Sequence, residues 1–191
     1  EHEHAGQKSV AVVDSNAKYG VTPRALQKLE ELGAQSLSFV ALTHPHADHY
    51  GGLEAILEQY QGRVGAIFTF PVDRSRERLE KLVSKYAESA KNSGSETVQS
   101  RAIQFIKFLK LAKEHPVWDA PTGLLGIVGV DGFDGLQVKQ VLPPSRVKGR
   151  YFSEIDSGRL RAEDDSENEL TLALVLEYKG HTILLGGDGT K

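Results

Sequence analysis

Residues 43–52, THPHADHYGG, constrain the fold of this chain more than any other stretch. They directly follow the apolar run 37–42 (LSFVAL), which is typical of a buried strand. The candidate ligands in this stretch are His44, His46, Asp48 and His49. Imidazole nitrogens and carboxylate oxygens suit zinc and similar divalent ions, and donors this close in sequence can converge without help from distant loops. The sequence therefore predicts a metal site at the end of a strand.

A lone histidine is more often an ordinary loop or core residue than a metal ligand, so the context of the motif decides. Here the pattern His-x-His-x-Asp-His lies between a predicted strand and the pair Gly51-Gly52, which lets the backbone approach closely. Apolar residues then recur at i, i+3, i+4 and i+7 from Leu53 to Tyr60 and predict an amphipathic helix. This strand, motif and helix order favours the metal site.

Composition sets the outer limits. The chain has 191 residues, 39% of them apolar and 26% charged, which is ordinary for one globular domain. No apolar run reaches the length of about 18 residues that a membrane span needs, and no signal peptide opens the chain. We therefore expect a cytoplasmic protein whose present segment makes no membrane contact. With no cysteine, any metal must rest on histidine and aspartate ligands.

The two ends of the sequence are unusual. Methionine is absent, including an initiator, and residues 1–4 stand only a few positions before an apolar strand pattern. The chain also stops shortly after another strand pattern, at Lys191. We interpret the sequence as a fragment cut at both ends, or as one from which some residues are missing.

Apolar patterning predicts two groups of strands separated by helices. The predicted strands are 10–13, 37–42, 64–69, 126–130, 136–142, 170–178 and 182–186. We expect the first three in one sheet and the last two in another, packed face to face between outer helices. Two helical stripes within 71–115 predict a helical hairpin that is inserted between the two groups.

Two further aspartates follow predicted strands. Asp188 follows Gly186-Gly187 at the end of the last strand, where it could bridge two metal ions. Asp14 follows the first strand, a position at which aspartate is also a common turn residue.

The order of these residues resembles the metal-binding motif of the metallo-β-lactamase superfamily. The resemblance implies an α+β fold, a four-layer αββα sandwich, with residues 1–191 forming a single incomplete domain. It also implies two divalent metal ions, zinc first, with manganese or iron as alternatives. By the resemblance, His44 and His46 bind the first ion, and Asp48 and His49 bind the second. The resemblance also implies that Asp188 would bridge the two ions and that Asp14 would support the ligand loop.

The layout of residues 168–188 is similar to the subgroup that includes the hydrolase domain of bacterial DNA-uptake proteins. One feature departs from the family pattern, in which many members carry a third histidine between the motif and the bridging aspartate. This chain offers only His115 and His181 there, and we interpret the first as a helix-end residue and the second as a surface residue beside a hairpin turn.

The predicted chemistry is hydrolysis by a hydroxide bound to two metal ions, with Asp48 orienting it. No serine elbow, P-loop or dinucleotide-binding glycine pattern offers a rival mechanism. Our first choice of substrate is a phosphodiester, in a small molecule or a nucleic acid. Besides the subgroup resemblance, it rests on a basic excess in 71–115 and on Arg146, Lys148 and Arg150 as phosphate-binding residues in a loop at 144–151.

Several observations keep alternatives open. The formal net charge of −3 argues against general nucleic-acid binding, which usually requires a basic surface. Basic residues on amphipathic helices are also often simply solvated. The second hypothesis is a hydrolase of small-molecule esters, lactones or thioesters, in which the hairpin is a lid or the contact of a homo-oligomer. The third is a non-catalytic interaction module with an incomplete metal site. The acidic run 163–169 is interpreted as a solvated loop.

Overall fold

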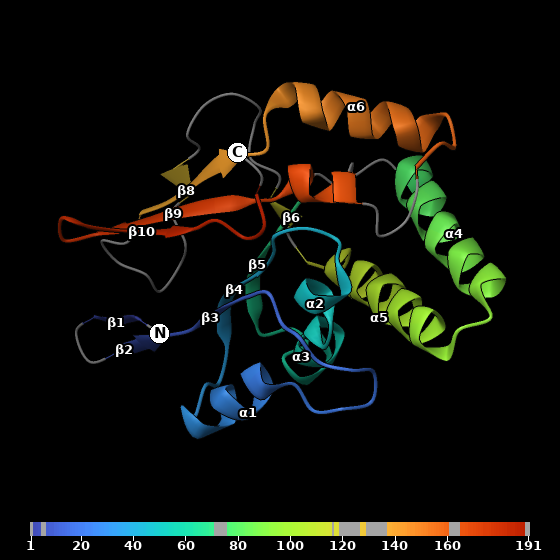
Figure 1. Ribbon diagram of the computed structural model, residues 1–191. Coiled ribbons are helices and arrows are strands. Elements are labelled where there is room, and N and C mark those ends of the chain that lie inside the picture. Colours follow the sequence, from blue (N-terminus) through green and yellow to red (C-terminus); the bar gives the residue numbers. More distant parts are fainter. Residues whose placement is uncertain are drawn as a thin grey trace.

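The computed structural model describes residues 2–4, 7–70, 76–115, 117–118, 127–128, 137–160 and 165–189. In these residues the strands form two four-stranded sheets and one two-stranded sheet (Figure 1). The small sheet pairs β1 (His2–His4) with β2 (Gln7–Ser9) at the N-terminal end.

The first large sheet is parallel and carries the histidine motif. Its order is β3 (Ala11–Val13), β4 (Leu37–Leu42), β5 (Val64–Thr69) and β6 (Val117–Trp118). The strands predicted at 10–13, 37–42 and 64–69 are therefore confirmed as members of one sheet. Helix α1 (Arg24–Glu31) connects β3 to β4, as a parallel pair requires. Since parallel strands end at the same edge, the residues after β3 and after β4 meet there.

The second large sheet is antiparallel, in the order β10, β9, β8 and β7. These strands span His181–Leu185, Ala173–Tyr178, Gln137–Leu142 and Ile127–Val128, respectively. Its β9–β10 hairpin confirms the predicted pairing of the last two strands, but the prediction that the first of them begins at residue 170 is wrong. Residues Asp165–Leu170 form a 3-10 helix, η1, and the Thr171 hydroxyl donates to the Asn168 carbonyl at 2.8 Å. This local hydrogen bond competes with strand pairing.

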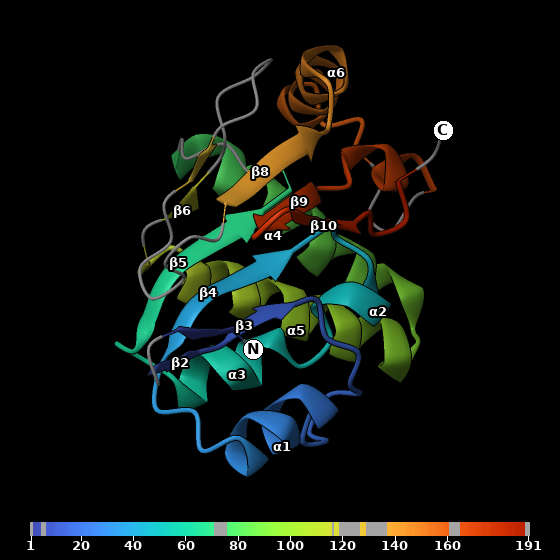
Figure 2. The same cartoon turned by 90° about the vertical axis from the view of Figure 1, so that its left-hand side faces the viewer.

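The two large sheets pack against each other (Figure 2). Phe39 of β4 and Phe68 of β5 contact edge to face at 5.2 Å, and both join a buried cluster with Leu172 and with Leu174 of β9. The alternate residues of β4, Val40 and Leu42, belong instead to the larger cluster on the helical side. This alternation follows from the two-residue period of a strand and places one apolar face on each neighbouring layer.

Helices cover the other face of the parallel sheet. Helix α3 (Leu53–Gln59) follows α2 (Ala47–Tyr50), and the predicted hairpin is present as α4 (Arg76–Ser93) and α5 (Glu96–Ala112). Phe105 and Phe108 of α5 are fully buried, and the Phe105 ring lies 4.9 Å from the Tyr50 ring. The hairpin is thus part of the main core, and its origin as an insertion stays a prediction.

The outer helical layer beyond the second sheet also stays a prediction. Leu184, on the face of β10 that points away from the sheet-to-sheet core, is 63% exposed.

Helix α6 (Ser145–Asp156) packs against α4 and η1. The loop predicted at 144–151 is therefore wrong, because Val147, Tyr151 and Ile155 recur every four residues and bury one face of a helix. In the described part of the chain, no helix has the length and apolar content needed to cross a membrane.

Candidate metal centre

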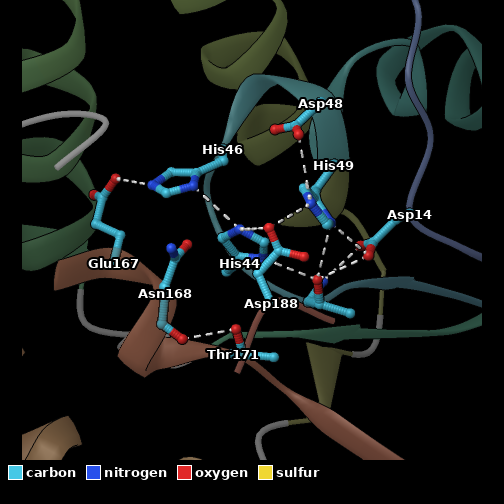
Figure 3. Close-up of polar contacts among 10 residues, drawn as sticks. Asp14, His44, His46, Asp48, His49, Glu167, Asn168, Thr171 and Asp188 are labelled. Atoms are coloured by element: carbon cyan, nitrogen blue, oxygen red, sulfur yellow. Dashed lines mark hydrogen bonds and ion pairs between the residues drawn. The ribbon is translucent and has the colours of Figure 1, made fainter. Parts of the chain in front are cut away.

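The histidine motif begins in a turn at the end of β4 and continues into α2, which contains Asp48 and His49. The backbone N–H of His46 donates to the carbonyl of His44 at 3.0 Å, and that of His49 donates to His46 at 2.9 Å. These bonds bring the rings together: the His44 centroid lies 4.6 Å from that of His46 and 4.0 Å from that of His49 (Figure 3). Three imidazoles from one short segment therefore share one small space.

Asp188 reaches this space from the second sheet. Its Oδ2 lies 3.6 Å from Nε2 of His49 and 4.0 Å from Nε2 of His44 (Figure 3). Among the described residues, His44, His49 and Asp188 form a group whose ligand atoms all lie within 4.8 Å of one another. These three side chains could hold a metal ion.

His46 and Asp48 flank that group. Nδ1 of His46 lies 3.2 Å from Nε2 of His44, and Oδ2 of Asp48 lies 3.8 Å from Nε2 of His49. The Asp48 side chain is 64% exposed, so it borders the open side of the cluster. The five sequence-predicted ligands are thus neighbours, and their division between two metal ions stays a prediction.

The position of Asp188 depends on the glycine before it. Gly187 has φ +50°, and a Cβ there would come within 2.8 Å of Thr171 Cγ2 and 3.0 Å of Thr43 Oγ1. The adjacent backbone is joined across the sheets, because Leu172 N–H donates to the Thr43 carbonyl at 2.7 Å. Strands β4 and β10 therefore end on the same side of the molecule, which the metal-site prediction required.

Asp14 contacts the motif from behind. It adopts φ +56°, a left-handed conformation that aspartate tolerates better than most residues. The Thr43 N–H donates to its Oδ1 at 2.8 Å, and its Oδ2 accepts bonds from the Thr43 hydroxyl and from Nδ1 of His49, each at 2.8 Å. A carboxylate on Nδ1 fixes the tautomer of His49, and the other nitrogen, Nε2, faces Asp188.

His44 is oriented by a related contact. The Thr43 hydroxyl donates its proton to Asp14, so its oxygen is an acceptor for the Nδ1–H of His44 at 3.1 Å. This arrangement turns the Nε2 lone pair of His44 toward His46 and Asp188.

The electrostatics of the two histidines differ. Burial, together with the neighbouring imidazoles of His49 and His46, lowers the pKa of His44 to about 4. The hydrogen bond to Asp14 raises the pKa of His49 above its ordinary value, against the opposing effect of burial. His44 is therefore neutral near pH 7, which is the form that binds metal. Two oriented Nε2 atoms beside a carboxylate fit a divalent ion such as zinc.

Glu167 is a member of the site neighbourhood that sequence reasoning missed. It lies in η1, is 1% exposed, and has its Oε2 3.7 Å from Nε2 of His46 (Figure 3). The interpretation of 163–169 as a solvated loop is therefore wrong for this residue, while 161–164 lie outside the described residues. A signal was present, since the run directly precedes the apolar segment that leads to Asp188.

The remaining candidates lie outside the three-residue group. His181 is exposed and begins β10, whereas Asp188 follows its other end, and His115 follows α5. Arg146 is exposed on α6, and Arg150 donates to Glu169 at 2.6 Å. Lys148 is only 4% exposed, which contradicts its predicted place in an accessible loop.

Comparison with known proteins agrees with the geometry. A family model described as the metallo-beta-lactamase superfamily matches residues 7–67, from β2 into β5. The matched segment contains Asp14 and the whole histidine motif. No curated protein matches this chain. The family match and the His44, His49 and Asp188 group together indicate a metal-dependent hydrolase.

Proposed function

We propose that this protein is a hydrolase that depends on two divalent metal ions, zinc first, with manganese or iron as alternatives. Its proposed ligands are His44, His46, Asp48, His49 and Asp188. The observation that carries the proposal is the convergence of Asp188, from the second sheet, on the histidines at the end of the first. Such ions, when bound, lower the pKa of a water molecule and stabilise charge on the attacked centre.

The residues of this chain have separate parts in that chemistry. Asp14 and Thr43 hold the Nδ1 protons of His49 and His44, so that both Nε2 atoms face the centre. Asp48 stands on the exposed side of the cluster, where its carboxylate can orient the attacking water and accept a proton from it.

The ion pairs of α4 and α6 favour a small-molecule ester, lactone or thioester as the substrate. Two of the basic side chains in the segments expected to bind phosphate have carboxylate partners: Arg150 pairs with Glu169 at 2.6 Å, and Arg78 of the hairpin pairs with Asp156 at 2.7 Å. Neutralised in this way, they offer little attraction to a nucleic acid. A phosphodiester is the second candidate, and the likeness of residues 168–188 to the DNA-uptake subgroup supports it.

Metal content and a substrate panel test the proposal. Purified protein should contain zinc, manganese or iron by elemental analysis, and chelation followed by metal addition should abolish and then restore hydrolysis. Turnover of p-nitrophenyl acetate or a thioester, without turnover of bis-p-nitrophenyl phosphate, would support the small-molecule ester. The opposite result would establish the phosphodiester. Protein that binds no metal and hydrolyses neither class would instead be the non-catalytic module.

A further inference from the structure

A buried carboxylate lies against His46 on the side away from the other imidazoles. Glu167 is 1% exposed, and its Oε2 is 3.7 Å from Nε2 of His46. The hydroxyl of Tyr86 is within 3.3 Å and 3.4 Å of the two carboxylate oxygens and within 3.2 Å of the Pro45 carbonyl. Tyr86 belongs to α4, so one side chain connects the helical hairpin, η1 and the histidine motif.

The two nitrogens of His46 face different partners. Nδ1 faces Nε2 of His44 at 3.2 Å, whereas Nε2 faces Glu167 (Figure 3). A carboxylate oxygen that accepts from Nε2 favours the tautomer with the proton on Nε2 and the lone pair on Nδ1. That lone pair points into the cluster. Because Glu167 lies beyond the opposite side of the ring, its geometry suits a partner of His46 and not a further ligand of the same ion.

We propose that Glu167 is a positioning residue that holds Nε2 of His46 and thereby presents Nδ1 to the metal centre. The arrangement parallels that of Asp14, which holds Nδ1 of His49 at 2.8 Å and leaves Nε2 for the centre. Tyr86 keeps the Glu167 carboxylate in place. This inference rests on the proposed function, because it assigns a role within the same metal site.

Buried carboxylates can also be purely structural, and Glu54 provides the comparison. Glu54 is 4% exposed on α3, and its Oε1 accepts a bond from the Gln104 amide at 3.0 Å. Glu169 provides a second control, because it lies two positions from Glu167 and pairs with Arg150. Replacing either by glutamine removes a carboxylate without touching His46.

The test measures metal binding to the metal-free protein. Zn²⁺ affinity is obtained by competition with a chelator, and the visible absorption of the Co²⁺-loaded protein reports the ligand geometry. Glu167→Gln should weaken Zn²⁺ binding by about 10-fold to 100-fold and change the Co²⁺ spectrum. Tyr86→Phe, which keeps the ring in the core, should act in the same direction with a smaller effect. Glu54→Gln and Glu169→Gln should bind as wild type does.

The outcomes separate this inference from the proposed function. Wild-type protein that binds neither Zn²⁺ nor Co²⁺ would overturn both. Metal binding by wild type with an unaltered Glu167→Gln affinity and spectrum would overturn only the role of Glu167. An equal loss in Glu54→Gln would also overturn it, since removal of any buried carboxylate would then have the same effect. Should Glu167→Gln fail to fold, Tyr86→Phe decides: wild-type affinity and spectrum in that variant would overturn the role.

Discussion

His44, His46 and His49 lie on one continuous segment after β4, whereas Asp188 reaches the same cluster from the end of β10 in the other sheet. The first group is held by a local turn and by Asp14. The second depends on how the two sheets pack, and the Asp188 side chain is 51% exposed. The comparison indicates that the histidine side of the centre is preformed, while its carboxylate side is only as rigid as the sheet-to-sheet contact.

The largest effect should come from removing the preformed side. In the double variant His44→Ala and His46→Ala, metal binding should be lost and hydrolysis should fall to the buffer background, because two of the clustered donors are gone. Circular dichroism should show a retained fold. His181→Ala, a change to an exposed histidine at the start of β10, is the control. Undiminished hydrolysis in the double variant would assign catalysis to another part of the chain.

A change behind the histidines should have a smaller effect. Asp14→Asn replaces the oxygen that accepts bonds from the Thr43 hydroxyl and from His49, and an amide cannot accept both while also accepting from the Thr43 N–H. Zn²⁺ affinity should fall by about 10-fold to 100-fold, measured by chelator competition. Asp156→Asn, at an exposed carboxylate paired with Arg78, is the matched control. Equal affinities for the two variants would contradict a special role for Asp14.

The carboxylate side can be tested with two glycines that both have positive φ. Gly187→Ala and Gly180→Ala should each cost roughly 1–2 kcal/mol of unfolding free energy, since both force alanine into a left-handed conformation. Only Gly187 would also meet Thr171 and Thr43, whereas Gly180 has open space around it. Gly187→Ala alone should therefore displace Asp188 and weaken metal binding. Thermal unfolding measures the loss of stability, and Zn²⁺ titration measures the loss of metal affinity. Equal Zn²⁺ affinities for the two variants would show that Asp188 still reaches the metal centre in Gly187→Ala.

The smallest effect on hydrolysis is expected from a substitution at Arg150, which lies outside both the histidine side and the Asp188 side of the centre. Arg150→Gln removes a half-exposed ion pair with Glu169, worth about 0.2–1 kcal/mol of stability. Hydrolysis of a small ester should keep the wild-type kcat/KM at low and high salt. A marked rise in the KM for a phosphodiester, together with a weaker dependence of that KM on salt, would instead show that Arg150 binds phosphate.

The sequence predicted best those parts whose neighbours are local. Strands β4 and β5 match their predicted bounds, because a nearly continuous apolar run signals a strand that is buried on both faces. The histidine motif was likewise evident, since its donors are adjacent in sequence. Asp188 was predicted from a strand end followed by glycines, although the bond that ties its neighbourhood to Thr43 had no signal in sequence.

The failures have physical reasons too. Glu167 lies in an acidic run, and its burial depends on Tyr86, which is 81 positions away in sequence. Helix α6 was missed because basic residues and Gly149 separate its few apolar positions, so the stripe is sparse. In both cases the charged residues indicated a solvent-exposed segment, whereas contacts with α4 bury part of it.

Thr43 joins parts of the centre that are far apart along the chain. Its carbonyl accepts the Leu172 N–H, and Gly187 packs against its side chain, so the two sheets are joined through residues far apart along the chain. Contacts of such long range carry a large loop-closure entropy and tend to form late. A chain leaving the ribosome thus presents its three motif histidines well before Asp188 has been synthesised. Any metal captured at that stage would lack its carboxylate partner, so the complete centre would form late in the maturation of the protein.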